Sequence, residues 1–355
     1  LKGNLEKIGE ASSILSYQTS LSPSQKIELS GGCQNHKAGI QKILQIFNQD
    51  KYNLGSADLI VHRVVHGGTK YHHVALLDLE VKQFIRDMIP LARTHHPASL
   101  ACIEEISEHF PEIPQSVVFD TSFHQTLPEY AWRYALPRKI SDQYAIRRYG
   151  FHGISHQSVV KQAASFLKTP VNKLNLITIH LGNGASISAI KKGICVDTTM
   201  GMTPLEGLVM GTRPGDLDPG ILTLLAREGW NQEALETMLN QDSGMKGLCG
   251  TNDFREILQN KEEGNEEAEM ALELYCYRVR KTIGSFSSVI GPVDALVFTG
   301  GVGENVPFVR ERSVRAMEWM NIQLDPDMND QAEAPCAIHS KNSKTKILVL
   351  PSDEE

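Results

Sequence analysis

The sequence lacks the features that define several protein classes. No apolar run approaches the ~20 residues of a membrane-spanning helix, and no signal-peptide pattern opens the chain. The six cysteines are far apart and form no CxxC pair, which is typical of free thiols in a reducing compartment and argues against a disulfide framework or a zinc site. The net charge of −7 argues against nucleic-acid and anionic-membrane partners, which favour a basic face. We therefore expect a cytoplasmic protein with small-molecule ligands.

The phosphate-binding motif GxxxxGK[ST] is also absent, which excludes a P-loop enzyme. Two other glycine-rich segments are present, at 180–186 (HLGNGAS) and 300–305 (GGVGEN). Each follows a short apolar run, 176–179 or 295–298, that is typical of a buried strand. Glycine lets the backbone turn sharply or approach a ligand closely. The two strand-to-glycine-loop elements predict one nucleotide held between two halves of a domain, and so a phosphotransferase.

The 355 residues suit two domains, and strands alternate with helices along the chain, which predicts an α/β protein. Asp78 is expected to cap a helix, and Pro97 fits the first turn of the next one. A hairpin is expected at 187–196 and a long amphipathic helix at about 265–290. Between them, residues 198–220 form a long loop rich in Gly, Pro and Thr, and loops of this length in compact domains are usually functional.

Four polar residues occupy positions suited to phosphoryl transfer. Arg213 lies in a glycine-proline loop, where its guanidinium could clamp an anion with two hydrogen bonds. Asp120 follows the strand-like 117–119, a place where α/β proteins bind ligands and metals, although it would also serve as an N-cap. His152 stands between glycines that let a ligand approach, and a core histidine is the alternative. Arg63 ends a strand beside a glycine turn, and a surface arginine is its alternative.

The 13 histidines include the adjacent pairs His72–His73 and His95–His96. Side chains of neighbouring residues diverge on either a strand or a helix, so a zinc-binding module built on these pairs is the weakest of the candidate functions.

Six strings occur in order over nearly the whole chain: RVVHGG (63–68), FDTSFH (119–124), YGFHG (149–153), HLGNGAS (180–186), TPLEGLVMGTRPGDLDPG (203–220) and GGVGEN (300–305). Together they resemble the acetokinase family of short-chain acyl kinases. The resemblance implies the fold shared by acetate and sugar kinases, 70-kilodalton heat-shock chaperones and actin, with a duplicated ribonuclease H-like core and the nucleotide in the interdomain cleft. The expected domains are 1–119, to which 347–355 would return, and 120–346.

The implied reaction is the reversible, Mg²⁺-dependent in-line transfer of a phosphoryl group from ATP to acetate, giving ADP and acetyl phosphate; Mn²⁺ is an alternative metal. Arg63 and Arg213 would steady the carboxylate and the transferring group, His152 would donate a hydrogen bond to it, and His95 would lie nearby. Asp120 would organise the metal. The implied protein ligand of the metal ion is Glu354, which matches the first glutamate of the family string TNEE. The implied ATP-binding residues are His180, Leu181, Gly182, Asn183, Gly184, Asp253, Phe254, Arg255, Gly301, Val302, Gly303, Glu304 and Asn305.

The acyl pocket departs from the family pattern. Val65, Phe151 and Pro204 match the residues that close around the acetate methyl group, but Thr94 stands where the family has Leu, and the string THHP replaces LHNP. One methylene in such a pocket is worth only ~1–3 kcal/mol, so propionate kinase activity is an alternative to acetate kinase activity.

The resemblance also implies a homodimer, an N-terminal strand with a phosphate-binding turn ahead of Leu1, and a helix after Glu355. We accordingly expect the printed chain to be a fragment that is poorly stable and inactive, because without the implied N-terminal strand the backbone groups of a central strand would be left unpaired. A functional alternative of another class keeps the fold without acyl transfer: an actin-like or chaperone-like nucleotide switch, which would hydrolyse ATP without a carboxylate.

Overall fold

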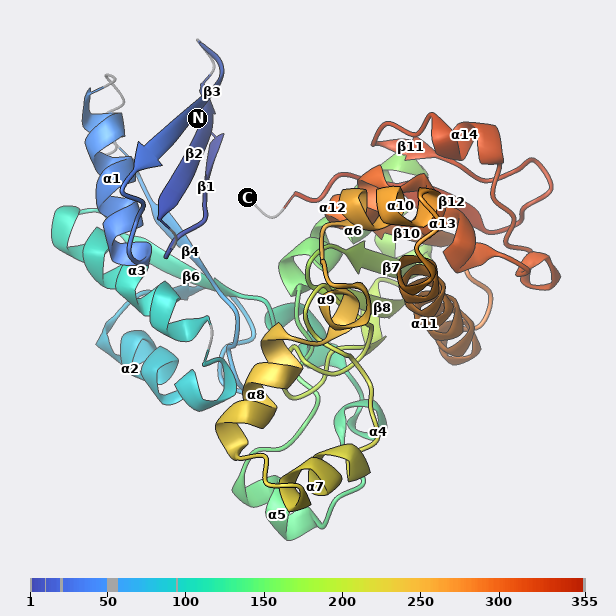
Figure 1. Ribbon diagram of the computed structural model, residues 1–355, viewed down its shortest axis with the longest axis horizontal. Coiled ribbons are helices and arrows are strands. Elements are labelled where there is room, and N and C mark those ends of the chain that lie inside the picture. Colours follow the sequence, from blue (N-terminus) through green and yellow to red (C-terminus); the bar gives the residue numbers. More distant parts are fainter. Residues whose placement is uncertain (1, 10, 20–21, 50–56, 94, 354–355) are drawn as a thin grey trace. The chain divides into compact units, whose positions relative to one another are not determined.

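The computed structural model describes residues 2–9, 11–19, 22–49, 57–93 and 95–353. The chain forms two compact units, Leu1–Phe119 and Asp120–Glu355 (Figure 1). Among the described residues, no helix combines the length and the apolar character needed to cross a membrane.

The first unit contains two small sheets with helices. The antiparallel sheet is β1 (Lys2–Glu6), β2 (Ser12–Thr19) and β3 (Ser22–Ser30), and the second sheet has the order β4 (Ile60–Val64), β6 (Gln115–Phe119), β5 (Ala75–Leu76). The helices are α1 (His36–Gln49), α2 (Leu79–Asp87) and α3 (His96–His109). As predicted, Asp78 caps α2, its side chain accepting from the Val81 N–H, and α3 has proline in its first turn. One apolar core joins α2 and α3 to β4 and β6: Val64, Val81, Ile85, Leu100, Ile103, Val117 and Phe119.

The second unit is built on a six-stranded sheet of order β11-β12-β10-β7-β8-β9. Its strands are β7 (Asn175–Leu181), β8 (Ala185–Lys191), β9 (Ile194–Thr198), β10 (Ala295–Thr299), β11 (Cys336–Ala337) and β12 (Lys346–Val349). The main helices are α6 (Gly153–Phe166), α7 (Gly220–Arg227), α8 (Gln232–Gln241), α9 (Gly244–Cys249), α10 (Phe254–Glu262) and α11 (Glu266–Ile290). Short helices complete it: α4 (Glu129–Trp132), α5 (Arg138–Gln143), α12 (Gly300–Asn305), α13 (Pro307–Val314) and α14 (Pro326–Asp330).

The central strands arise from the apolar runs noted in the sequence. Every residue of β10 is buried, as are Leu176 to Ile179 of β7, which is typical of strands covered on both faces. The predicted hairpin is the pair β8–β9, the predicted long helix is α11, and the long loop extends from β9 to α7. Residues 347–355 were expected to return to the first domain, but β12 pairs in parallel with β10 and is a strand of the second unit's sheet.

The segment 300–305 is not the glycine loop that the sequence predicted. It forms the short helix α12 directly after β10. Gly300 makes the sharp turn with φ +79°, a conformation that glycine adopts readily, and the Glu304 carboxylate accepts a hydrogen bond from its N–H at 2.9 Å. This contact satisfies one of the backbone donors that a helix start leaves without a partner.

Candidate active site

The parallel strands β7 and β10 bring the two glycine-rich segments together. Thr299, the last residue of β10, lies beside His180, and a β-carbon on Gly300 would meet the backbone of Leu181. The sequence expectation that these two segments share one site therefore agrees with the sheet register. Because the strands are parallel, their carboxyl ends meet at one edge of the sheet, which is where open α/β sheets bind ligands.

His152 is held at the start of α6 by a close backbone contact. It adopts the left-handed conformation with φ 57°, and the next N–H, that of Gly153, donates to the Asp120 carbonyl at 2.9 Å. A β-carbon on Gly153 would lie 2.1 Å from that carbonyl oxygen, so the contact requires glycine. Asp120 is 2% exposed, and this contact ties the first residue of the second unit to the start of α6.

Two imidazole rings stack in the site. The rings of His152 and His180 have centroids 4.4 Å apart and an interplanar angle of 28°. Nδ1 of His152 lies 2.9 Å from the Ser186 hydroxyl, and Nδ1 of His180 lies 2.8 Å from the Ser155 hydroxyl. The hydroxyls of Ser186 and Ser155 therefore fix the orientation of the two rings.

Arg213 is anchored within its loop. Its Nη1 donates to the Pro204 carbonyl at 2.5 Å, and its backbone carbonyl accepts from the Met210 N–H at 3.0 Å. Burial lowers the pKa of the guanidinium to about 10, so the group remains a cation at neutral pH. A positive charge held in a largely desolvated place interacts strongly with an anion.

Gly184 is the point on which Arg213 and His152 converge. A β-carbon at Gly184 would lie 2.9 Å from Nη2 of Arg213 and 3.1 Å from Nε2 of His152. A guanidinium nitrogen and an imidazole nitrogen therefore border one small space beside the glycine loop. This arrangement suits an oxyanion, for which both groups are hydrogen-bond donors when charged.

The remaining expected nucleotide residues have mixed environments. Asp253 caps α10 and pairs with Arg255, which holds the pKa of the aspartate at about 2, and Phe254 is buried against Tyr275. Gly301 faces open space, while Val302 and Gly303 are buried. Asn305 donates back to the Gly301 carbonyl at 2.9 Å, and Asn183 accepts from Asn252 at 2.9 Å.

Three of the expected residues belong to the first unit. Arg63 lies on β4 and is exposed, Val65 follows that strand and is partly buried, and His95 is the exposed N-cap residue of α3. Thr94 and Glu354 lie outside the described residues.

His96, by contrast, is a buried structural histidine. Its Nδ1 donates to the Ile85 carbonyl at 2.9 Å, and its Nε2 accepts from the His66 N–H at 3.1 Å. Burial lowers its pKa, which agrees with the neutral form that these two contacts need. With both ring nitrogens engaged, His96 does not offer the metal ligand that the histidine-pair hypothesis requires.

The metal expectation names Asp120 and Glu354, of which only Asp120 lies within the described residues. Among the described ranges, no group of three or more His, Cys, Asp and Glu side chains is arranged to hold a metal ion. Mg²⁺ often binds through one or two carboxylates together with substrate phosphates and water, so a single buried carboxylate at the end of β6 fits that pattern.

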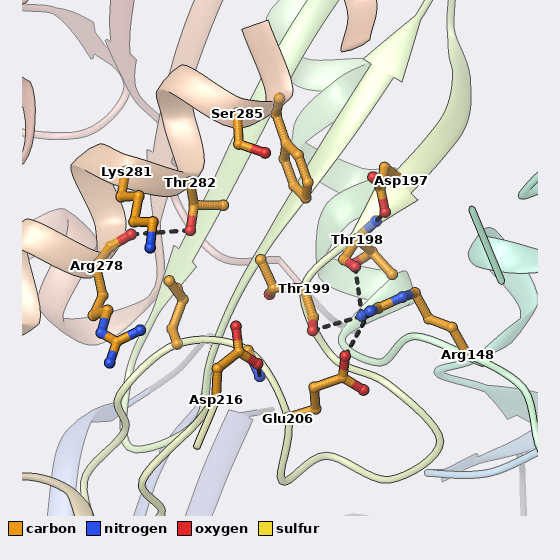
Figure 2. Close-up of a pocket in the computed structure, with 13 residues that line it drawn as sticks. Arg148, Asp197, Thr198, Thr199, Glu206, Asp216, Arg278, Lys281, Thr282 and Ser285 are labelled. Atoms are coloured by element: carbon orange, nitrogen blue, oxygen red, sulfur yellow. Dashed lines mark hydrogen bonds and ion pairs between the residues drawn. The ribbon is translucent and has the colours of Figure 1, made fainter. Parts of the chain in front are cut away.

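A separate cavity of about 230 Å³ lies between α11 and the loop that starts after β9 (Figure 2). There Arg148 donates to the carbonyls of Thr198, Thr199 and Met200 at 3.0, 2.8 and 3.2 Å, and pairs with Glu206 at 2.6 Å. These contacts fix the first part of the loop that carries Pro204 and Arg213. Neither Arg148 nor Glu206 was singled out from the sequence.

The sequence analysis also missed the serines and His156 behind the stacked rings. His152, Ser155 and His156 are spaced i, i+3 and i+4, which places them on one face of a helix, and this was the signal available. Ser186 stands within a recognised string, but its role depends on the pairing of β8 with β7, which sets it opposite His180.

The fold and the site define a class: an α/β protein in which two adjacent parallel strands bring two glycine-rich segments together, with an arginine and a histidine beside the first of them. Comparison with known proteins makes the class specific. The chain belongs to the acetokinase family, whose model matches residues 1–355. The resemblance deduced from the six strings, the enzyme class that it implies and the predicted fold are thus confirmed.

Individual relatives agree with this assignment. Acetate kinase of Sulfurovum sp. (strain NBC37-1) is 47% identical over 358 residues, 99% of this chain and 89% of the relative. Among solved structures, Porphyromonas gingivalis acetate kinase is 40% identical with a TM-score of 0.89, and the alignment covers 99% of this chain and 90% of the other. A propionate kinase from Francisella tularensis subsp. tularensis SCHU S4 is 38% identical with a TM-score of 0.92, at 99% and 90% coverage.

Proposed function

We propose that the protein transfers the terminal phosphoryl group of ATP to acetate, reversibly, forming acetyl phosphate and ADP. The observation that carries this proposal is the convergence of Arg213 and His152 on Gly184, at the carboxyl ends of β7 and β10. Phosphoryl transfer depends on positioning and on neutralising charge that spreads over the phosphoryl oxygens, and this place supplies a partly buried cation and a fixed imidazole.

The roles follow from the chemistry of each side chain. Arg213 holds an oxygen of the transferring group, and His152 donates a second hydrogen bond to it. Asp120 organises Mg²⁺, which when bound neutralises phosphate charge and orients the oxygens. Arg63 binds the substrate carboxylate, and the expected glycine-loop residues bind the nucleotide. We also propose that the protein forms a homodimer and that it is located in the cytoplasm. The six free cysteines support the cytoplasmic location.

Propionate is the second candidate substrate. It is supported by the similarity to the Francisella tularensis protein described as a propionate kinase and by the departure at Thr94 from the family leucine. A hydrophobic pocket discriminates weakly between substrates that differ by one methylene.

The test is acyl-hydroxamate formation from ATP, Mg²⁺ and hydroxylamine with acetate, propionate or butyrate. It is run on the printed chain and on a version extended with the terminal segments of the Sulfurovum relative. Tenfold preference for acetate supports the proposal, and equal or better use of propionate supports the second candidate. ATP hydrolysis that does not depend on any carboxylate, with no acyl phosphate formed, would overturn both and support a nucleotide switch.

A further inference from the structure

A line of polar side chains extends from His152 into the interior of the second unit. Nδ1 of His152 lies 2.9 Å from Oγ of Ser186, which lies 2.8 Å from Nε2 of His156. On the far side of that ring, Nδ1 of His156 lies 2.8 Å from Oγ1 of Thr178. Ser186, His156 and Thr178 are each 0% exposed. We call this line the histidine relay.

The direction of the hydrogen bonds in the relay follows from its inner end. Thr178 donates its hydroxyl proton to the Ser188 carbonyl at 3.5 Å, which leaves its oxygen as the acceptor for His156. Nδ1 of His156 therefore carries a proton. Burial, with smaller effects of the neighbouring His124 and His180, holds the pKa of His156 well below its usual range, so the ring is neutral and its Nε2 is an acceptor.

The donor and acceptor roles of Ser186 and His152 then follow, because each hydrogen bond needs one donor and one acceptor. A serine hydroxyl has one proton, and Ser186 must donate it to Nε2 of His156. Its oxygen is then left as an acceptor for His152, whose Nδ1 must carry a proton. We propose that Ser186, His156 and Thr178 are positioning residues that hold His152 in its Nδ1–H tautomer, so that Nε2, the nitrogen beside Gly184, is where His152 gains its second proton.

The consequence for the reaction rests on the proposed function. In this tautomer, neutral His152 has an acceptor at Nε2 and cannot donate to a phosphoryl oxygen there; only the imidazolium donates. The groups around it bear on that protonation: Arg213 near Gly184, His180 stacked on the ring, and neutral His156 behind Ser186. A phosphoryl anion would favour the imidazolium, whereas Arg213 alone opposes it.

The tautomer can be read directly by long-range ¹H–¹⁵N NMR of ¹⁵N-histidine-labelled protein, with the signals of His152 assigned by their loss in His152→Asn. We expect the neutral ring to be the Nδ1–H form. Ser186→Ala and Thr178→Val should each move His152 toward the Nε2–H form that imidazole favours in water. Thr178 does not contact His152, so an effect of Thr178→Val distinguishes the relay from a local packing change.

Ser155→Ala is the matched control. It removes the same kind of contact, a serine hydroxyl on Nδ1, from His180 instead of His152. It should change the His180 signals and leave the His152 tautomer as it is. A neutral wild-type His152 in the Nε2–H form, or a His152 tautomer that survives both Ser186→Ala and Thr178→Val, would overturn the proposal.

Kinetics give an independent readout in the extended version of the chain. Ser186→Ala should lower kcat about tenfold with little change in the KM for acetate, because the neutral Nε2–H ring that it favours is a weaker donor than the imidazolium. It should also flatten the alkaline limb of the pH profile, because donation at Nε2 then no longer requires the second proton. The tautomer measurement needs no turnover. A failure of acyl transfer would therefore leave the relay testable, and a wrong tautomer would overturn the relay without touching the proposed function.

Discussion

The imidazole of His152 lies flat against that of His180, with ring centroids 4.4 Å apart and 28° between the ring planes. Two stacked imidazoles cannot both be charged without strong repulsion, so protonation of one ring disfavours protonation of the other. Each ring is fixed in place by its own serine, since Nδ1 of His152 contacts the Ser186 hydroxyl and Nδ1 of His180 contacts the Ser155 hydroxyl.

Gly184→Ala should lower kcat by about 10²-fold. The new β-carbon would take the space between Nη2 of Arg213 and Nε2 of His152, and small displacements of groups that position a reacting atom have large kinetic effects. Steady-state kinetics of the extended version would measure this loss. Gly284→Ala is the control, since its β-carbon meets nothing within 4 Å and it lies on α11, away from the site. A Gly184→Ala variant with unchanged kcat would contradict the assignment of this space to the transferring group.

Gly153→Ala and Gly284→Ala should change the free energy of unfolding in opposite directions. The first puts a β-carbon 2.1 Å from the Asp120 carbonyl oxygen, an overpacked contact that costs about 1–3 kcal/mol or more. The second replaces glycine within α11 where space is open and should stabilise by about 1 kcal/mol. Denaturant midpoints followed by circular dichroism test both. Equal midpoints for the two variants would refute the contact between Gly153 and Asp120.

Arg213→Ala should lower kcat/KM on the order of 10³-fold, the scale of an arginine that stabilises a phosphoryl transition state. Arg213→Lys keeps a charge but loses the fork that also holds the Pro204 carbonyl, so an intermediate loss is expected. Arg138→Ala, on exposed α5 with its side chain 3.5 Å from Asp142, should be close to wild type. If Arg213→Ala retained most of its activity in the hydroxamate assay, Arg213 would have no place in the mechanism.

Stability should fall as the pH drops from about 6.5 to about 4, in part through His124. Burial lowers the pKa of this ring to about 4, while Nε2 contacts the Phe151 carbonyl at 2.9 Å. In this window the unfolded chain binds a proton that the folded chain refuses, so unfolding is favoured as the pH falls. The full effect is about 3 kcal/mol, from roughly 1.4 kcal/mol per pKa unit.

The variant His124→Gln isolates the contribution of His124 to the pH dependence of stability. It is expected to be less stable than wild type at pH 7 but to lose less stability between pH 7 and pH 5. Urea unfolding at the two pH values makes the comparison. Parallel losses in the two proteins would show that His124 does not supply this pH dependence.

The sequence predicted those parts of the fold that depend on local apolar pattern. The buried strands β7 and β10 could be predicted because each is a continuous apolar run. The long helix α11 could be predicted from the helical spacing of its apolar residues. The sheet β1–β2–β3 was not predicted, since its strands are rich in Ser, Gln and Lys and bury few side chains, among them Leu15 and Tyr17. Such strands are defined by pairing with one another more than by their own composition.

The candidate site was predicted to a similar extent. The strings led to Arg213, His152 and the glycine segments, but they could not reveal which atoms meet. The contact of His152 with Ser186 depends on the hairpin register, and the support of the loop by Arg148 depends on residues 50 or more positions apart in the chain. Glu304 shows the same limit: the sequence suggested a nucleotide contact, whereas its carboxylate accepts from Gly300 and from Ser352.

Gly184 contributes to the site because it lacks a β-carbon. The place where other residues carry a β-carbon lies 2.9 Å from Nη2 of Arg213 and 3.1 Å from Nε2 of His152, which is too close for a methyl group. The bare backbone therefore lets both nitrogens pack against the glycine segment. Any side chain at this position would displace the two groups that are proposed to bind the transferring phosphoryl group.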